Sequence, residues 1–209
     1  MSDERARSVA VAITGASGAV YATRTLAALL SRGLHVELVV SEYGARLLHD
    51  ELGLSKGVQG IHPFLLQKYG DEAGRGTLSV HGNKDLGATL ASGSHGCSGL
   101  VIVPCSMKTL AGVAHGLSRN LVERAADVML KERRRLVIVP RETPMSLPQL
   151  KNMVLCAEAG ATILPAMPAF YQLPKTLDDL ADFMAGKILD ALGFDHELYP
   201  AWTGTVRDA

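Results

Sequence analysis

Short apolar runs alternate with longer amphipathic stretches near the start of the chain. The run Val9–Ile13 is followed by an amphipathic stretch from Val20 to Ser31, and a second apolar run covers Val36–Val40. Gly33 lies where glycine commonly ends a helix. A strand, a helix and another strand in so short a span predict two parallel strands joined by a right-handed crossover.

The apolar run LVIVP occurs twice, at 100–104 and at 136–140. Neither run contains a charged residue, which is typical of strands buried on both faces. A last short strand is expected within 161–171, before a proline-rich loop. The helices expected around these strands cover 105–116, 117–135, 147–159 and 176–193. One apolar face of the second helix is expected to carry Leu117, Leu121, Ala125, Val128 and Met129.

Strands that alternate with helices predict an α/β fold, with a doubly wound parallel sheet between two layers of helices. The 209 residues suit a single domain over 1–209. Glycines interrupt the stretch from 53 to 99, where we expect one helix near Pro63–Tyr69, one strand at Leu78–His81 and long loops. Long loops in compact domains are often functional.

Composition and charge exclude several classes of protein. Apolar residues make up 47% of the chain, and the formal net charge is zero, which argues against a nucleic-acid-binding surface. No apolar run approaches the length of a membrane span, and no apolar signal core follows the charged N-terminus, so we expect a cytoplasmic protein. The histidines lack metal-site spacing, so no metal is expected. Reduced, buried thiols are expected at Cys97, Cys105 and Cys156.

The loops that follow the strands carry the candidate chemistry. Ligands of doubly wound sheets bind beyond the carboxyl ends of the strands. Hydroxyls, charges or prolines occur in every loop there, and together these loops are expected to outline one pocket. The loops are 14–18, 41–42, 105–109, 141–144 and 165–171.

Three of these loops have both a functional and a purely structural interpretation. The turn Gly15–Gly18 lacks both dinucleotide and P-loop spacing, so it suits a mononucleotide phosphate, a flavin edge or simply a tight turn. Ser106 could bind an anion or only cap its helix, and Lys108 could be a solvated surface charge. Arg141 and Glu142, directly after a buried strand, could grip a phosphate and accept a proton, or form a structural ion pair.

Six stretches of the chain together resemble the UbiX-like flavin prenyltransferases. They occur in the order of that family and are spread over most of the chain, from 14 to 180. They are TGASGA (14–19), ASGSHG (91–96), VPCSMKTLAGVAHG (103–116), NLVERAADVMLKERRRLVIVPRETP (120–144), MVLCAEAGATILPAMPAFY (153–171) and TLDDL (176–180).

The resemblance implies a flavodoxin-like or Rossmann-like flavoprotein that forms a homo-oligomer, usually a dodecamer. The family joins a dimethylallyl group, usually from dimethylallyl monophosphate, to N5 and C6 of reduced FMN. No metal is needed. The product, prenylated FMN, is the cofactor of UbiD-type decarboxylases, which would be the partners of this protein.

The resemblance also implies roles for individual residues. FMN would be held by Gly15, Ala16, Ser17, Ser41, Ser106, Met107, Lys108, Thr109 and Arg141. The donor phosphate would be held by Lys131, Arg141, Tyr171 and Lys187, with Arg124 reaching the site from a neighbouring subunit. The implied catalytic residues are the family acids Glu51 and Glu142, together with Ser17, Lys131 and Tyr171.

The chain departs from some members of that family. A tryptophan before the ASGS segment is replaced by the sequence Lys84–Gly87, and Lys187 stands where many members have arginine. Lysine keeps the charge but loses the planar fork of arginine. The tail, about 194–209, contains Trp202, which could close over a neighbouring site or simply pack.

Two other functions remain open from the sequence. A phosphopantothenoylcysteine-type decarboxylase shares the expected fold and the flavin, but it reads Pro-Ala-Ser-Ala-Asn-Thr where this chain has Pro104–Thr109. It also needs an early catalytic histidine, for which His49 is a poor candidate. A non-catalytic FMN carrier would need no second anion site, which argues against it here.

Overall fold

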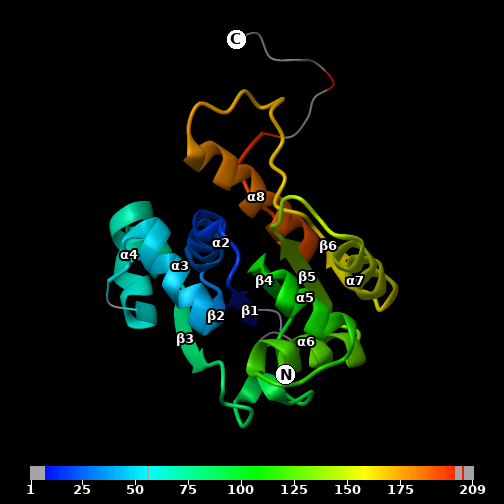
Figure 1. Cartoon of the computed structure of the whole chain (residues 1–209). Helices are drawn as coiled ribbons and strands as arrows, with labels where there is room; N and C mark the ends of the chain where they lie inside the picture. Colours follow the sequence, from blue (N-terminus) through cyan, green and yellow to red (C-terminus); the bar gives the residue numbers. More distant parts are fainter. Residues whose placement is uncertain (1–7, 56, 201–203, 205–209) are drawn as a thin grey trace.

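The computed structural model describes residues 8–55, 57–200 and 204. Its centre is one sheet of six parallel strands in the order β3-β2-β1-β4-β5-β6 (Figure 1). The strand order reverses between β1 and β4, and such a reversal is where doubly wound sheets bind ligands. The strands are β1 Ser8–Ile13, β2 His35–Val40, β3 Thr77–Gly82, β4 Gly99–Cys105, β5 Arg135–Pro140 and β6 Thr162–Ile163.

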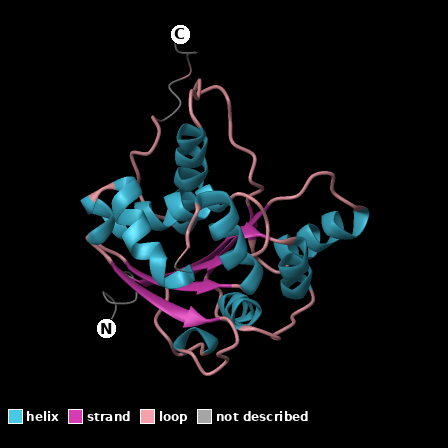
Figure 2. Ribbon diagram, turned by 60° about the vertical axis from the view of Figure 1, so that its left-hand side comes forward, coloured by secondary structure: helices cyan, strands magenta, loops and turns pink. Residues whose placement is uncertain are grey.

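Helices cover both faces of this sheet (Figure 2). One face packs against α2 Ala19–Ser31, α3 Glu42–Leu52, α4 Ile61–Tyr69 and α8 Leu177–Leu192. The other face packs against α5 Met107–Ala114, α6 Leu121–Lys131 and α7 Leu147–Glu158. Short 3-10 turns occur at η1 Gly57–Gly60, η2 Asp71–Gly74 and η3 Thr89–Ala91. This arrangement confirms the expected three-layer α/β/α fold.

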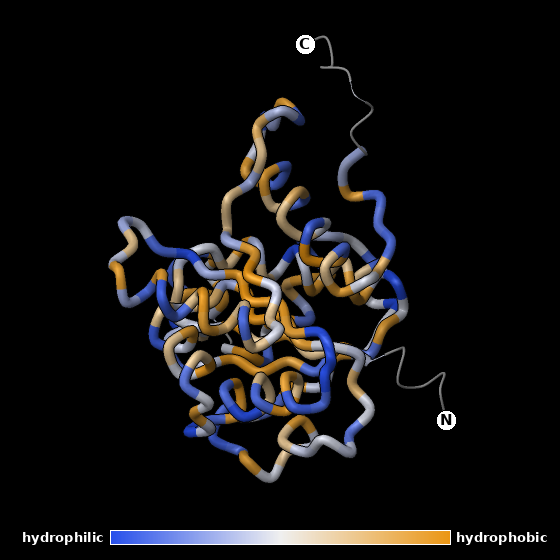
Figure 3. Tube along the Cα trace, turned by 90° about the vertical axis from the view of Figure 1, so that its right-hand side faces the viewer, coloured by the Kyte–Doolittle hydropathy of each residue, from blue (hydrophilic) through white to orange (hydrophobic). Residues whose placement is uncertain are grey.

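Burial explains why the apolar runs form the central strands. Every residue of β1 and of β4 is buried, and the apolar part of the trace gathers at the sheet (Figure 3). Alternate residues of one strand face opposite helix layers, so Val9 and Val11 pack in one core while Ala10 and Ala12 pack in the other. The three cysteines are buried and free, as expected.

The sequence analysis missed helix α3. Its 11 residues contain only one fully buried large side chain, Leu48, so the apolar pattern is weak. The helix is specified instead by a local signal, because the Ser41 hydroxyl accepts a hydrogen bond from the Gly44 amide at 3.0 Å. Capping at Ser41 thus starts a helix that the hydrophobic periodicity does not reveal.

A second expectation was wrong at the start of α6. Leu117 does not lie on the buried face of that helix: it precedes the helix and is 38% exposed. The physical reason is the Asn120 side chain, which accepts a hydrogen bond from the Glu123 amide at 3.0 Å and begins the helix at Leu121.

The connection that leads into α8 projects from the rest of the chain, together with the first turns of that helix (Figures 1 and 2). It carries several exposed apolar side chains, namely Met167, Phe170, Tyr171, Leu173 and Leu177. The described part of the tail, up to Pro200, packs on α8 of the same chain, where Tyr199 and His196 leave no room for a side chain at Gly186. Trp202 lies outside the described residues.

Candidate functional site

Thr14 links the carboxyl ends of the two central strands. Its hydroxyl donates to the Pro104 carbonyl at 2.9 Å and accepts from the Ser106 amide at 2.8 Å. The side chain is buried, so both of these groups stay satisfied away from water. The turn after β1 and the start of α5 are therefore held together at the point where the strand order reverses.

Gly15 allows α3 to approach this turn closely. A Cβ atom added at Gly15 would lie 2.5 Å from the Cβ of Tyr43. The Ser41 amide also donates to the Ile13 carbonyl at 2.9 Å, which ties the end of β2 to the end of β1. The small residue is thus required by packing against α3.

A cavity of about 310 Å³ opens beside these turns. Five of the residues expected to hold FMN line it, namely Gly15, Ser41, Ser106, Lys108 and Thr109. Thr14 and Glu42, from the loops expected to outline a pocket, also line it, whereas the sequence analysis missed Tyr43, Asn83, Asn120, Val122 and Glu123. Of these, Asn120 could have been found, because asparagine before an apolar helical run is a typical N-cap.

Three helices begin at this cavity, and their caps Ser41, Ser106 and Asn120 all line it. The capping interpretation of Ser106 holds, since its hydroxyl accepts from the Thr109 amide at 3.3 Å. The N-terminal ends of helices carry partial positive charge and suit anions. Helix ends, hydroxyls and the Lys108 ammonium therefore fit the phosphate and the sugar-like chain of FMN.

Glu123 brings a carboxylate to the wall of the cavity. It is buried, which works against its ionisation, but hydrogen bonds from the Arg119 guanidinium and amide outweigh burial and hold the pKa of Glu123 below its usual value. The ionised carboxylate is neutralised by that arginine, at 2.8 Å between Oε1 and Nη2. Its charge is therefore balanced within the chain itself.

A second polar group lies at the start of α2 and the end of β5. The Glu51 carboxylate accepts hydrogen bonds from the amides of Gly18 at 3.0 Å and Ala19 at 2.8 Å. The Arg141 Nε donates to the Ser17 carbonyl at 3.1 Å. Ser17, Glu51 and Arg141, three of the expected site residues, are thus brought together at the N-terminal end of a helix.

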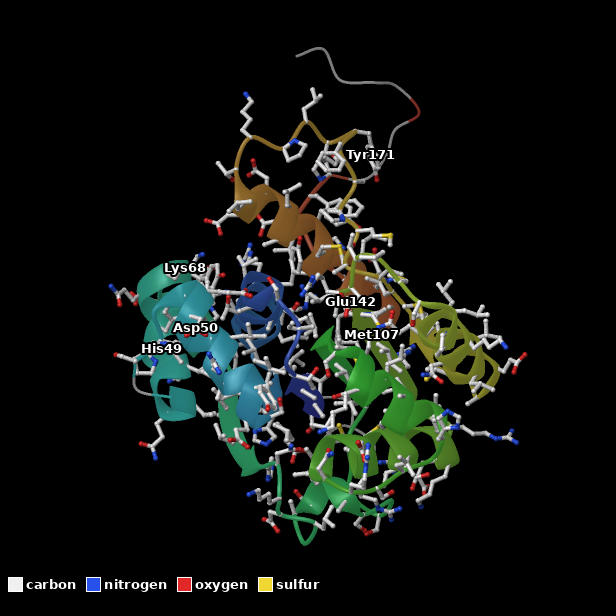
Figure 4. All side chains as sticks on the ribbon, in the orientation of Figure 1. His49, Asp50, Lys68, Met107, Glu142 and Tyr171 are labelled. Carbon is white, nitrogen blue, oxygen red and sulfur yellow. The ribbon has the colours of Figure 1, made fainter. Side chains whose placement is uncertain are left out.

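Arg141 and Glu142 have different hydrogen-bond partners in the described part of the chain. The Glu142 carboxylate accepts from the Thr143 amide at 3.1 Å, whereas Arg141 turns to Ser17. Cys105 pairs with Pro140 across β4 and β5, so Ser106 and Arg141 leave neighbouring positions of the sheet. Glu142 and Met107 therefore lie at the same edge (Figure 4).

Tyr171 lies farther out, on the projecting connection (Figure 4), and Lys187 lies on α8. The Tyr171 ring packs edge-on against Phe183, with 6.1 Å between ring centroids. The Lys187 Nζ lies 3.3 Å from the Asp190 Oδ2, and Asp190 also binds the Tyr199 hydroxyl and His196. These contacts tie Lys187 to the described part of the tail.

Arg124 and Lys131 lie elsewhere in the chain. Lys131 is the last residue of α6, just before β5 begins at Arg135, whereas Arg141 follows the opposite end of β5. A strand of six residues spans about 20 Å. Lys131 instead pairs with Glu132 at 2.6 Å, and Arg124 donates to the Ala91 carbonyl at 3.0 Å. One chain therefore does not bring all the expected phosphate ligands together.

A larger hollow, of about 820 Å³, lies near the C-terminal end of α2. It is lined by residues of both charges, among them Arg32, Glu72 and Asp195, and by none of the expected site residues. The described residues contain no cluster of histidine, cysteine and acidic side chains that could hold a metal ion. No helix in the described ranges has the length and apolar character of a membrane span.

Comparison with known proteins decides the family. Residues 1–188 match the family model described as Flavoprotein. The chain is 50% identical to the flavin prenyltransferase UbiX of Halalkalibacterium halodurans, over 95% of this chain and 94% of that protein. It is 42% identical to the flavin prenyltransferase UbiX of Pseudomonas aeruginosa, over 93% of each chain. The chain belongs to the flavin prenyltransferase family.

Solved structures of this family share the fold. AnUbiX (PadA1), crystallised with FMN and dimethylallyl pyrophosphate, has a TM-score of 0.84 and 37% identity over 95% of this chain and 98% of its own. A dodecameric FMN-dependent UbiX-like decarboxylase from Escherichia coli O157:H7 has a TM-score of 0.81 and 36% identity over 94% of this chain and 100% of its own.

The cysteine decarboxylase alternative is supported at the level of the fold alone. A phosphopantothenoylcysteine decarboxylase variant matches with a TM-score of 0.52 and 20% identity. His49, its candidate catalytic histidine here, lies on α3, exposed and 3.0 Å from Asp50 (Figure 4). It is not among the residues that line the 310 Å³ cavity.

Proposed function

We propose that the protein transfers the dimethylallyl group of dimethylallyl monophosphate to N5 and C6 of reduced FMN. One observation carries this proposal. A loop that lines the cavity and the Arg141–Glu142 pair follow adjacent strands, β4 and β5, at the same edge of the sheet. A carrier of FMN needs only the first of these two features. A prenyl transfer needs both, because each of its two substrates bears a phosphate.

The cavity is assigned to FMN. The hydroxyls of Ser41, Ser106 and Thr109, with Lys108, would hold polar groups of this ligand at the helix ends. Ala16, Ser17 and Met107 do not line this cavity; they are assigned to FMN because they belong to the same two turns, and Gly15 lets α3 approach the first of them. Reduced FMN supplies the electron-rich ring that accepts the dimethylallyl group. This chain supplies the binding and orientation of both substrates.

Arg141 is assigned to the phosphate of the donor, with Tyr171 and Lys187. Its guanidinium can bind two phosphate oxygens at once, and its charge stabilises the leaving phosphate as negative charge develops. Glu142 is the proposed proton acceptor, because it follows Arg141 directly and is only partly buried at the same edge. Glu51 and Ser17 would fix the turn that separates the two substrates.

Arg124 and Lys131 are assigned to the site of a neighbouring copy. Lys131 lies at the opposite edge from Arg141 of its own chain, Arg124 donates to the Ala91 carbonyl, and a family relative is described as dodecameric. We therefore propose that the protein forms a closed homo-oligomer, a dodecamer, in which each site draws residues from more than one subunit. A UbiD-type decarboxylase is the proposed recipient of the product.

Anaerobic incubation tests this function. The purified protein is mixed with reduced FMN and dimethylallyl monophosphate or diphosphate, and the mass of the flavin is measured. A gain of one five-carbon prenyl unit is expected, and the two donors then compare mono- with diphosphate. An unchanged flavin from protein that binds FMN would contradict the proposal and favour a carrier. Oxidation of a cysteinyl substrate to an enethiolate would favour the decarboxylase.

A further inference from the structure

Glu37 is a carboxylate buried in the sheet, away from the 310 Å³ cavity. It lies on β2, and only 2% of its surface is exposed. Four side chains donate to its two oxygens. Ser8 and His95 bind Oε1, while His81 and Thr89 bind Oε2. Such full satisfaction is what makes a buried carboxylate tolerable.

Two of these donors belong to the long connection between β3 and β4. Thr89 and His95 lie within residues 83–98, a stretch whose only regular element is the short turn η3. The same connection begins with Asn83, which lines the cavity and accepts hydrogen bonds from the amides of Leu121 and Val122. Glu37 thus anchors the half of this connection that lies farther from the cavity.

Arginines hold the backbone of the same stretch. The Arg134 guanidinium donates to the carbonyls of Gly93 at 2.6 Å and His95 at 2.7 Å, and Arg124 donates to the Ala91 carbonyl at 3.0 Å. Lys131 lies directly against Gly93, where a Cβ atom would come within 2.7 Å of its ammonium. Residues 91–95 and Lys131 therefore form one surface, whose shape depends on these anchors.

We propose that Glu37 is a positioning residue: through Thr89 and His95 it fixes residues 91–95 against Lys131, and so sets the affinity for the phosphate of the prenyl donor. The inference rests on the proposed function, because it requires Lys131 to bind that phosphate. Glu37 itself touches no substrate. The charged and titratable groups around it are His81 on β3, His95 and Cys97 on the connection, and Arg134 beyond α6.

The test compares variants that remove single hydrogen bonds with one that only weakens the core. Glu37→Gln, His95→Phe and Thr89→Val each weaken the anchor. Val36→Ala removes buried volume from the same strand without touching it. We expect the three anchor variants to raise the KM for dimethylallyl monophosphate about tenfold, while the Kd for FMN stays within about twofold. Val36→Ala is expected to lower Tm and leave this KM unchanged.

Hydrogen exchange supplies a readout besides activity. Amides of residues 89–95 are expected to exchange faster in Glu37→Gln than in Val36→Ala. Anchor variants that lower Tm but keep both the donor KM and this exchange unchanged would overturn the inference, because Glu37 would then be merely structural. A wild-type protein that leaves the flavin unprenylated would instead contradict the proposed function. Even then, amide exchange at residues 89–95 that is the same in Glu37→Gln as in wild type would contradict a positioning role for Glu37.

Discussion

Polar side chains in two regions of the sheet differ in how many hydrogen-bond partners the chain provides for them. In the interior of the sheet, Glu37 on β2 receives four side-chain donors, and Arg134, just before β5, donates to two backbone carbonyls. At the carboxyl edge, by contrast, Arg141 donates to the Ser17 carbonyl and Glu142 accepts from the Thr143 amide, so both side chains bind nearby backbone. Buried polar groups that the chain itself satisfies stabilise the structure, whereas partly exposed charges at the carboxyl edge are suited to a ligand.

The largest expected effect comes from the acid at the carboxyl edge. Glu142→Gln should lower the kcat of prenyl transfer by about 100-fold or more, because a positioned proton acceptor contributes that much. The Kd for FMN should not change, since Glu142 does not line the cavity. Anaerobic single-turnover experiments measure both. Glu158→Gln, an exposed glutamate on α7, is the control. Equal rates of prenyl transfer for Glu142→Gln and Glu158→Gln would contradict a catalytic role for the carboxyl edge.

A smaller effect is expected at the narrow turn. Gly15→Ala places a Cβ atom 2.5 Å from that of Tyr43, so α3 and the turn after β1 must move apart. Overpacking of this kind costs about 1–3 kcal/mol of unfolding free energy, and FMN binding should weaken as well. Urea denaturation and flavin titration measure the two changes. In the control, Gly82→Ala, the nearest atom to the new Cβ is 4.0 Å away, and both quantities should stay near wild type.

The pH dependence of stability tests the role of the buried Glu37 carboxylate. Burial opposes ionisation of Glu37, but hydrogen bonds and charges from His95, Ser8 and His81 outweigh it and hold its pKa below 4.5. Because the pKa in the folded state is lowered, the ionised group stabilises the fold above the ordinary glutamate pKa. This stabilisation is lost as the pH falls through the folded value.

Wild type should therefore exceed Glu37→Gln in Tm most clearly near neutral pH. The difference should shrink once the pH falls below 4.5 and passes the lowered pKa of the folded state. Thermal melts over this range measure it. A difference that is constant with pH would show that the charge of Glu37 does not stabilise the fold.

The smallest expected effect is on thiol reactivity. Burial raises the pKa of Cys97 and of Cys156 to about 11, and raises that of Cys105 as well. Since the thiolate is the reactive form, iodoacetamide should label none of the three thiols in the folded protein at neutral pH. Mass spectrometry before and after unfolding measures the labelling. Rapid labelling of the native protein would contradict the buried, closed core.

The sequence predicts the core of the fold well because its strands are strongly apolar. LVIVP forms β4 and β5, and Val9–Ile13 lies within β1. Helix α3 was not predicted, because one capping hydrogen bond and one buried leucine specify it, and neither produces a periodic apolar pattern. Leu117 was misplaced because the cap at Asn120, three residues later, sets the start of α6. Boundaries depend on such single contacts.

The candidate site could be predicted only in part, for a topological reason. Loops that follow strands share an edge, so Gly15, Ser41 and Ser106 were expected together and do line one cavity. Lys131 precedes strand β5, which places it at the other edge from Arg141. A resemblance between sequences matches residues one by one and does not show at which edge of the sheet each lies. Asn83 and Glu123 reach the cavity through tertiary packing that no local pattern encodes.

Subunit complementation tests most directly whether the two edges meet in one site between copies. Arg141→Ala and Lys131→Ala subunits are each expected to be nearly inactive when expressed alone. Assemblies from equal co-expression should recover about a quarter of wild-type prenyl transfer, because random mixing leaves that fraction of sites with both intact residues. If both residues served the site of their own subunit, every mixed site would lack one of them. Inactive mixed assemblies would therefore contradict the account.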